Sequence, residues 1–223
     1  MSAPELCHVF MFVEPGAPEA EALERLGLRE SYRRDHPGQG TTNVCYCFDN
    51  AFLELLWVTD RAAIVSPVVA RTGLSERADW RENGANPFGI ALRGAPAAPF
   101  PTWDYKPPYL PAGMSIPVAC SSDDSAQPLL FMSPGNARPD QWQDGRAGNR
   151  QLTGGLSEIA KLELTLADGV PLSDDLQALV NMEILELGKE NAGSEPRLVL
   201  TVTRSDGGPD RRLELPAMKW LEA

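Results

Sequence analysis

This chain has few imidazole side chains that could act as an acid or base or bind a metal ion. The chain has two histidines, His8 and His36. His8 lies in an apolar run of strand length, where alternation along the strand places it on one face with Leu6, Phe10 and Phe12. A histidine on an apolar face is usually a satisfied core residue. In the alternative, it binds a metal ion through a neutral ring nitrogen.

Glu54 is the more informative residue, because it interrupts a second apolar run. It shares a strand face with Phe52, Leu56 and Val58. An unpaired buried carboxylate is costly, so Glu54 is expected to be paired, hydrogen-bonded or bound to a metal. The alternative is a solvent-facing position on a partly covered sheet. Together with His8 it offers one nitrogen and one carboxylate oxygen, which suit a divalent transition metal but are too few for a tight site.

A polar loop, residues 36–43, leads into the next expected strand. His36 begins it, and Gln39, Thr41 and Asn43 supply hydrogen-bonding side chains between glycines that permit a close backbone approach. These four residues are candidates for lining a ligand pocket. The alternative is a structural turn in which they satisfy the local backbone.

Composition excludes several classes of function. The chain has 223 residues and a formal net charge of −11, from 20 Lys and Arg against 31 Asp and Glu. That charge argues against nucleic acid and against an anionic membrane surface as partners. The arginines at 25, 29, 33 and 34 are interpreted as a solvated face. No leader or apolar run of membrane-spanning length is expected, and four sparse cysteines indicate reduced thiols and a cytoplasmic location.

These candidate residues require strands to position them, and the two ends of the chain show the same order of elements. Residues 1–60 predict a strand, a helix and three strands, the first of the three at 28–34. Residues 156–223 predict the same order, with Ser173 as the cap of the helix and later strands at 183–187, 197–204 and 211–215. Both closing strands contain Leu-Glu-Leu, at 53–55 and 213–215. We interpret the two segments as duplicated modules, in which Glu214 is the repeat partner of Glu54.

Between the modules, residues 61–155 are expected to form an insertion. Residues 61–82 are helical in pattern with a break at Pro67, and three short strands follow within 88–132. Half of the sixteen aromatic residues fall between positions 80 and 142. Long loops with aromatic side chains pack over either a core face or a ligand pocket, and the core face is the commoner case.

The segments His8-Val9-Phe10, 36–43 and Phe52-Leu53-Glu54-Leu55-Leu56 resemble the glyoxalase-like domain of the vicinal oxygen chelate superfamily. The resemblance covers residues 5–60 strongly and the segments 88–93 and 109–111 more loosely. It implies an α+β fold of two βαβββ modules whose curled mixed sheets surround a shared cavity. In metal-dependent members, His or Glu residues on the first and last strands of each module hold a divalent ion, which acts as a Lewis acid on substrate oxygens.

Carried over onto this chain, the resemblance implies that His8, Glu54 and Glu214 hold a metal ion and that Glu54 is catalytic. The ion is expected to be Zn, Mn, Fe or Ni. The leading hypothesis is a metal-dependent lyase, isomerase or dioxygenase that acts on a small oxygenated molecule. The alternative is a resistance-type protein that binds a small molecule without catalysis, and a third is a scaffold whose cavity is filled by its own side chains. The partner is a small molecule, and the chain is a monomer or a homodimer.

Overall fold

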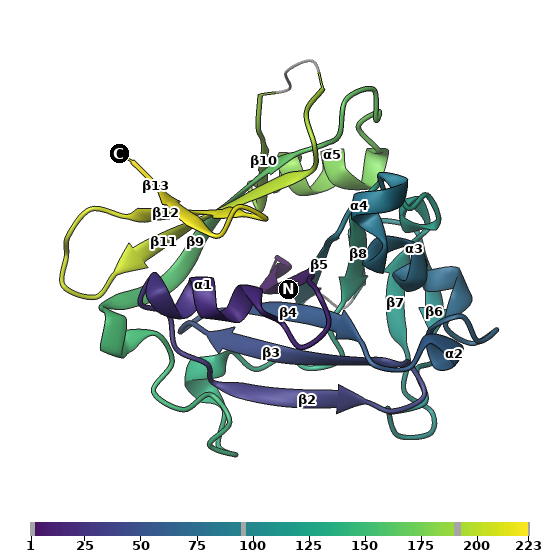
Figure 1. Cartoon of the computed structure of the whole chain (residues 1–223), viewed down its shortest axis with the longest axis horizontal. Coiled ribbons are helices and arrows are strands. Elements are labelled where there is room, and N and C mark those ends of the chain that lie inside the picture. Colours follow the sequence, from purple (N-terminus) through teal and green to yellow (C-terminus); the bar gives the residue numbers. More distant parts are fainter. Residues whose placement is uncertain (1–2, 95–96, 190–192, 223) are drawn as a thin grey trace.

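The computed structural model describes residues 3–94, 97–189 and 193–222, and its strands form two separate sheets. One sheet has eight strands from the first part of the chain, and the other has five strands from the last part (Figure 1). Short helices accompany both sheets, so the predicted α+β class is confirmed. None of the helices in these ranges has both the length and the apolar character to cross a lipid bilayer.

The larger sheet has the strand order β2-β3-β4-β1-β5-β8-β7-β6. Its central strands are buried along almost their whole length, because both faces of the sheet are covered. The strands are β1 (Glu5–Phe12), β2 (Tyr32–His36), β3 (Thr41–Cys47), β4 (Phe52–Val58), β5 (Phe88–Arg93), β6 (Thr102–Tyr105), β7 (Ile116–Ala119) and β8 (Leu129–Met132).

The sheet consists of two halves with the same pairing pattern. In the first half β1 pairs with β4 in parallel, and β3 and β2 follow outward as antiparallel neighbours. In the second half β5 pairs with β8 in parallel, and β7 and β6 follow in the same way. The antiparallel pair β1–β5 joins the halves at the centre. Strands of both halves therefore curl around one common face.

The second half comes from residues 88–132, whereas we expected it from residues 156–223. The expectation was wrong because an order of strands and helices is a local property, while strand pairing depends on contacts between distant segments. The strands inside the expected insertion 61–155 complete the sheet instead. The described residues of the proline-rich segment 94–112 contribute the strand β6, which lies at the edge of the sheet, where prolines are tolerated.

Residues 156–222 do contain the predicted order of elements, but they build a sheet of their own. Its strand order is β10-β9-β11-β12-β13, with only β9 and β10 parallel. This order differs from that of either half of the larger sheet. The strands are β9 (Leu156–Thr165), β10 (Leu185–Leu187), β11 (Arg197–Arg204), β12 (Arg211–Leu215) and β13 (Lys219–Leu221).

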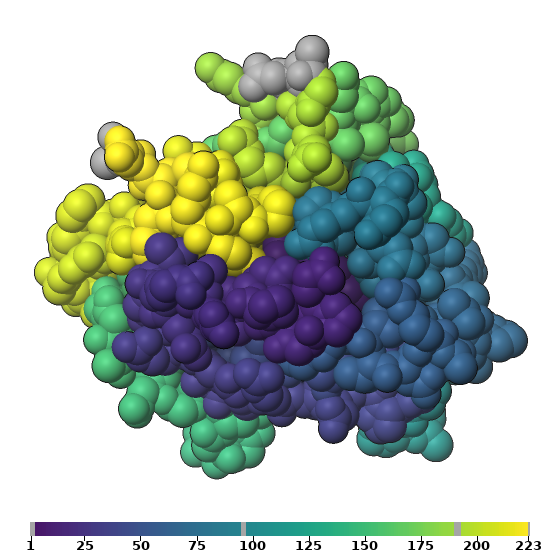
Figure 2. All heavy atoms as spheres, viewed as in Figure 1, coloured from purple at the N-terminus to yellow at the C-terminus, as the bar shows by residue number. Residues whose placement is uncertain are grey.

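The second sheet covers one face of the first, which we call the core face. Val9 and Leu53 on the core face are fully buried in one cluster with Leu162 and Leu200 of the second sheet. Burial of each such side chain contributes roughly 1.5–3 kcal/mol. In the space-filling view, the N-terminal segment (purple) and the C-terminal strands (yellow) lie in direct contact (Figure 2). The other face of the first sheet, which we call the pocket face, packs in a second buried cluster that includes Phe12, Leu56 and Ile64.

The helices are short and follow their local signals. Ser173 caps the longest of them, as predicted, because its hydroxyl accepts a hydrogen bond from the Leu176 N–H at 3.3 Å. Pro67 lies between separate helical segments, which confirms the predicted break. The α-helices are α1 (Glu19–Arg25), α2 (Arg61–Ile64), α3 (Leu74–Ala78), α4 (Trp80–Asn83) and α5 (Asp174–Asn181), and the 3-10 turns are η1 (Ala70–Thr72), η2 (Cys120–Asp123), η3 (Pro139–Gln141) and η4 (Leu152–Gly154).

A β-bulge in β1 changes which side chains accompany His8. The pairing of β1 with β5 shifts register between Leu6 and His8. Phe10 and Phe12 lie on the pocket face, as expected from alternation, but Leu6 packs against the core face. Cys7 takes its place, so that Cys7 and His8 both line the pocket.

Candidate functional site

A cavity of about 460 Å³ opens on the pocket face of the eight-stranded sheet. Because this space is open, the alternative of a cavity filled by the protein's own side chains is wrong. The first half of the sheet contributes the polar lining residues His8, Arg34, His36, Gln39, Asn43 and Glu54, and the segment after β8 contributes Ser133, Asn136 and Arg146. The aromatic lining residues come from both halves and from the loop after β8: Phe10, Tyr32, Phe52, Tyr105, Tyr109, Phe131 and Trp142.

Glu54 lies in the middle of β4 with its carboxylate in the cavity wall and is only 6% exposed. The Asn43 side-chain N–H donates to Oε1 of this carboxylate at 2.6 Å from the neighbouring strand β3. Burial raises the pKa of Glu54 to about 7, and the Asn43 hydrogen bond and the charge of Arg34 oppose this rise only in part. Glu54 is thus a buried carboxyl group that gains or loses its proton near neutral pH, the property expected of a general acid or base.

His8 lies beside Glu54, on β1. Its ring stacks on Phe52 with the centroids 4.3 Å apart, and its Nε2 lies 3.6 Å from Glu54 Oε2. That separation is too long for a hydrogen bond. Burial lowers the pKa of His8 to about 3, so the imidazole is neutral near pH 7 and the contact is not an ion pair. A neutral imidazole next to a carboxylate matches the pair predicted from the sequence.

His8 and Glu54 supply too few ligand atoms for a metal site. In the described parts of the chain, no group of three or more His, Cys, Asp or Glu side chains could hold a metal ion. The equivalent strands of the second half, β5 and β8, present Ala91, Leu129 and Phe131 on the pocket face. These side chains are apolar and cannot act as ligands. His8 and Glu54 alone do not fit a divalent ion, which usually takes three or four protein ligands.

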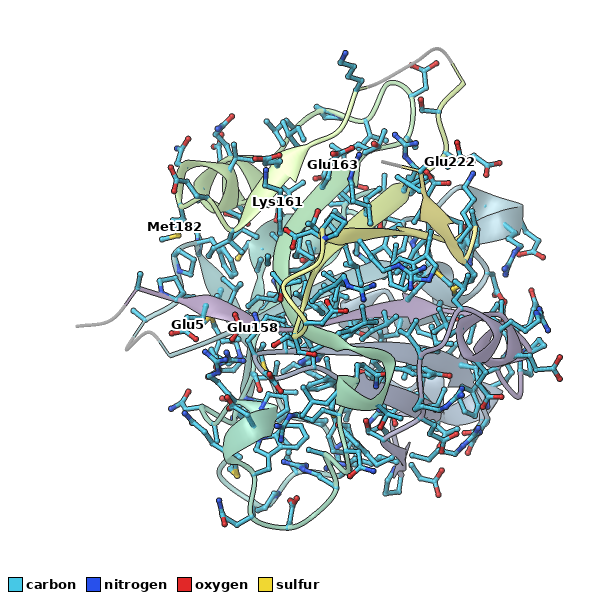
Figure 3. All side chains as sticks on the ribbon, turned by 90° about the vertical axis from the view of Figure 1, so that its left-hand side faces the viewer. Glu5, Glu158, Lys161, Glu163, Met182 and Glu222 are labelled. Atoms are coloured by element: carbon cyan, nitrogen blue, oxygen red, sulfur yellow. The ribbon has the colours of Figure 1, made fainter. Side chains whose placement is uncertain are left out.

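Glu214, the third expected ligand, lies on β12 of the second sheet and does not line the cavity. Its carboxylate forms ion pairs with Arg197 at 3.1 Å and Lys219 at 3.2 Å. Glu163 lies on the same sheet, labelled in Figure 3, and pairs with Arg212 at 2.8 Å. The expectation for Glu214 was wrong because it followed from a repeat between segments that do not share a sheet.

The polar loop 36–43 forms a directed chain of hydrogen bonds at the cavity wall. The Tyr105 hydroxyl donates to Gln39 Oε1 at 2.9 Å, and Gln39 Nε2 donates to Thr41 Oγ1 at 2.8 Å. Thr41 Oγ1 lies 3.0 Å from His36 Nδ1. Of the predicted pocket residues, His36, Gln39 and Asn43 line the cavity. Thr41 does not line it but contacts His36 and Gln39 through its hydroxyl.

Glycine is required in this loop at Gly40. Its φ is +82°, and a Cβ added there would lie 2.3 Å from the backbone oxygen of Asp60. The loop therefore packs directly on the residue that caps α2, which fixes the position of Gln39 and Thr41 beside it. This is the close backbone approach that the sequence suggested.

Several lining residues were missed from the sequence, and alternation along β2 would have revealed one of them. Tyr32, Arg34 and His36 alternate along this strand and all line the cavity, although Arg34 was interpreted as part of a solvated face. Trp142 is a second lining residue that the sequence analysis missed. Its ring packs edge-on against Tyr32 and Phe52. Four of the eight aromatic residues of the middle segment, Tyr105, Tyr109, Phe131 and Trp142, thus line the cavity. Phe88 and Phe100 pack in the core cluster instead, so both alternatives apply to part of the set.

The cysteines show no sign of reactivity. Cys7, Cys45 and Cys47 are buried free thiols, as predicted, and burial raises the pKa of each. Cys120 is exposed, which differs from the expected core position. The Sγ of Cys7 lies 3.4 Å from Nδ1 of its neighbour His8, whereas Nδ1 of His36 contacts Thr41.

Comparison with known proteins shows what the chain is similar to. A family model described as a glyoxalase-like domain matches residues 6–100. No curated protein sequence matches the chain. The solved structure of a hypothetical protein from Staphylococcus aureus aligns over 95% of this chain and 86% of its own, at 11% identity and a TM-score of 0.46. A triple mutant of 4-hydroxymandelate synthase from Streptomyces coelicolor aligns over 100% of this chain and 66% of its own, at 13% identity and a TM-score of 0.48.

Proposed function

We propose that this protein, whose residues 6–100 match a family model described as a glyoxalase-like domain, binds a flat, largely apolar small molecule in the cavity of its eight-stranded sheet. The observation that carries the proposal is the division of the cavity wall. Strands β2 to β4 contribute buried or charged polar groups such as Arg34, Asn43 and Glu54, whereas β7 and β8 contribute apolar side chains such as Ile116, Leu129 and Phe131. Such a wall suits a ligand with an apolar body and a polar edge.

The aromatic residues support a flat ligand. Tyr32, Phe52 and Trp142 contact one another edge-on, with ring centroids 5.8 to 6.3 Å apart. Ring faces that are not covered by another ring are available for stacking on a planar molecule. The buried polar groups Glu54 and Asn43 would then orient the ligand through hydrogen bonds. Asn43 Oδ1 is buried without a hydrogen-bond partner, and a ligand donor would satisfy it.

Binding of 2-naphthamide, a neutral bicyclic probe, tests the proposal by isothermal titration calorimetry. We expect binding with a stoichiometry of one. Trp142→Ala should weaken it by roughly tenfold, since aromatic contacts contribute about 1 kcal/mol beyond area burial.

The matched variants Met114→Trp and Leu152→Trp supply the control. Both native side chains are 40% exposed, but only Met114 lines the cavity. Met114→Trp should reduce the affinity and Leu152→Trp should leave it unchanged. Absence of binding to the parent protein, or equal effects of the two variants, would count against the cavity as a binding site.

A metal-dependent lyase, isomerase or dioxygenase is the second candidate, supported by the 3.6 Å contact between His8 and Glu54. Because two protein donors are too few for tight binding, we expect no stoichiometric Zn, Mn, Fe or Ni after dialysis of untagged protein. Elemental analysis measures this directly. Near-stoichiometric metal in the parent, lost in both His8→Ala and Glu54→Gln, would reverse the order of the two candidates.

A further inference from the structure

We propose that the ligand carries a carboxylate, which Arg34 and His36 of β2 bind beside the ring of Tyr109. This inference rests on the proposed binding function and adds the chemical class of the ligand, an aromatic carboxylate. It follows from three observations on the pocket face of β2: the positions of its side chains, the hydrogen-bonding state of His36, and the balance of charge around the cavity.

Alternation along β2 brings both groups to the cavity. Arg34 and His36 are two residues apart and therefore lie on one face of the strand, where both line the cavity. They flank the same ring, because the Arg34 guanidinium carbon lies 5.4 Å from the Tyr109 ring centroid and the His36 centroid lies 4.8 Å from it. Arg33, the residue before Arg34, lies on the opposite face of the strand and binds Glu30 through two hydrogen bonds of 2.9 Å.

The hydrogen-bond chain behind His36 leaves one N–H directed at the ligand. Gln39 Nε2 already donates to Thr41 Oγ1, so the Thr41 hydroxyl proton is free to be donated to His36 Nδ1. A ring nitrogen that accepts this bond leaves the proton of the neutral imidazole on Nε2. Burial keeps His36 neutral by lowering its pKa to about 4. His36 therefore presents an Nε2–H donor, which needs an oxygen acceptor.

Arg34 supplies the positive charge of the proposed carboxylate site. The Arg34 guanidinium contacts the Tyr109 ring. Arg34 forms no ion pair with a carboxylate of the described residues. A guanidinium next to a ring N–H forms a pair of donors suited to a carboxylate. An arginine that rests on an aromatic face is also held in place before the ligand arrives, which lowers the entropic cost of binding.

The charge around the cavity differs from that of the whole chain. The chain carries −11, but the cavity lining contains two arginines, Arg34 and Arg146, and a single carboxyl group, Glu54. The Arg146 guanidinium lies 3.9 Å from the Trp142 ring centroid and 5.8 Å from that of Tyr32. A cationic ligand would meet these arginines, whereas an anionic one is attracted by them.

The test compares three naphthyl probes of one shape at pH 6 with EDTA: 2-naphthoate, 2-naphthamide and 2-naphthylmethylammonium. Calorimetry of the parent should show 2-naphthoate binding at least about tenfold more tightly than the amide, as expected for a charge-assisted pair, and the ammonium most weakly. Arg34→Met should remove the preference for the carboxylate while the amide still binds. Arg33→Met, the neighbour on the opposite face, should preserve it.

His36 is tested separately from Arg34. Because an amide oxygen also accepts from Nε2–H, His36→Phe and Thr41→Val should weaken both naphthoate and naphthamide and leave their ratio nearly unchanged. Equal binding of naphthoate and naphthamide to the parent, or an unaltered preference in Arg34→Met, would overturn the inference while the binding function stands. If no naphthyl probe binds, the proposed function fails and the inference fails with it.

Discussion

Replacing Glu54 with glutamine is expected to stabilise the protein by about 3 kcal/mol above pH 7 and to change its stability little near pH 4.5. The ordinary pKa of a glutamate is 4.5 and burial raises that of Glu54 to about 7. One pKa unit corresponds to about 1.4 kcal/mol, so the ionised form carries a penalty of about 3 kcal/mol in the folded protein. Glutamine has the same shape, and its Oε1 can still accept the hydrogen bond from Asn43.

The sign follows from proton binding in the two states. Between pH 4.5 and 7 the folded protein holds a proton on Glu54 that the unfolded chain has released, so stability falls as the pH rises. His8 and His36 act in the opposite sense, because burial lowers their pKa values from 6.5 to about 3 and about 4. Their contribution is complete above pH 6.5 and is lost as the pH falls toward these values.

Urea unfolding of the parent and Glu54→Gln at pH 4.5, 6 and 8, with EDTA present, measures this effect. Glu82→Gln on α4 is the matched control, since Glu82 is exposed. The control should show the same pH dependence as the parent. A free-energy difference between parent and Glu54→Gln that is equal at pH 4.5 and pH 8 would contradict the interpretation of Glu54 as a buried carboxyl group with a raised pKa.

Replacing Arg77 with methionine is expected to cost about 3–5 kcal/mol of stability. Arg77 is fully buried on α3, and its guanidinium donates to five backbone carbonyl groups at 2.9 to 3.5 Å. Three of these, the carbonyls of Ser122, Asp124 and Gln127, belong to the connection between β7 and β8. Methionine would leave buried carbonyl oxygens without donors, each at a cost of about 1–3 kcal/mol.

Arg71→Met is the control for Arg77→Met, because Arg71 is an exposed arginine of the same region that pairs with Asp123. Its loss should cost less than about 1 kcal/mol. Chemical unfolding of both variants gives the comparison. Stability of Arg77→Met within about 1 kcal/mol of the parent would show that the five hydrogen bonds are not needed to hold α3 against the second half of the sheet.

Local patterns in the sequence predicted the elements well. The strands 88–93, 197–204 and 211–215 were predicted with the bounds that the structure has, because apolar runs and turn-forming residues are local signals. The capping role of Ser173 and the break at Pro67 are local in the same sense. The strand near Tyr32 was predicted too early in the chain, since its exposed residues carry little apolar pattern.

The sequence by itself determined the α+β class, the resemblance of residues 5–60 to a glyoxalase-like domain, and the placement of His8 and Glu54 on strands of one module, which the structure pairs side by side. Only the tertiary structure decided which segment pairs with the first half of the sheet. It thereby removed Glu214 from the cavity and brought Arg34, Tyr109 and Trp142 into it. The physical reason is that the periodicity of a strand specifies which side chains share a face, but hydrogen bonding between backbones is nearly independent of sequence. The choice of partner strand is therefore made by the packing of the whole chain.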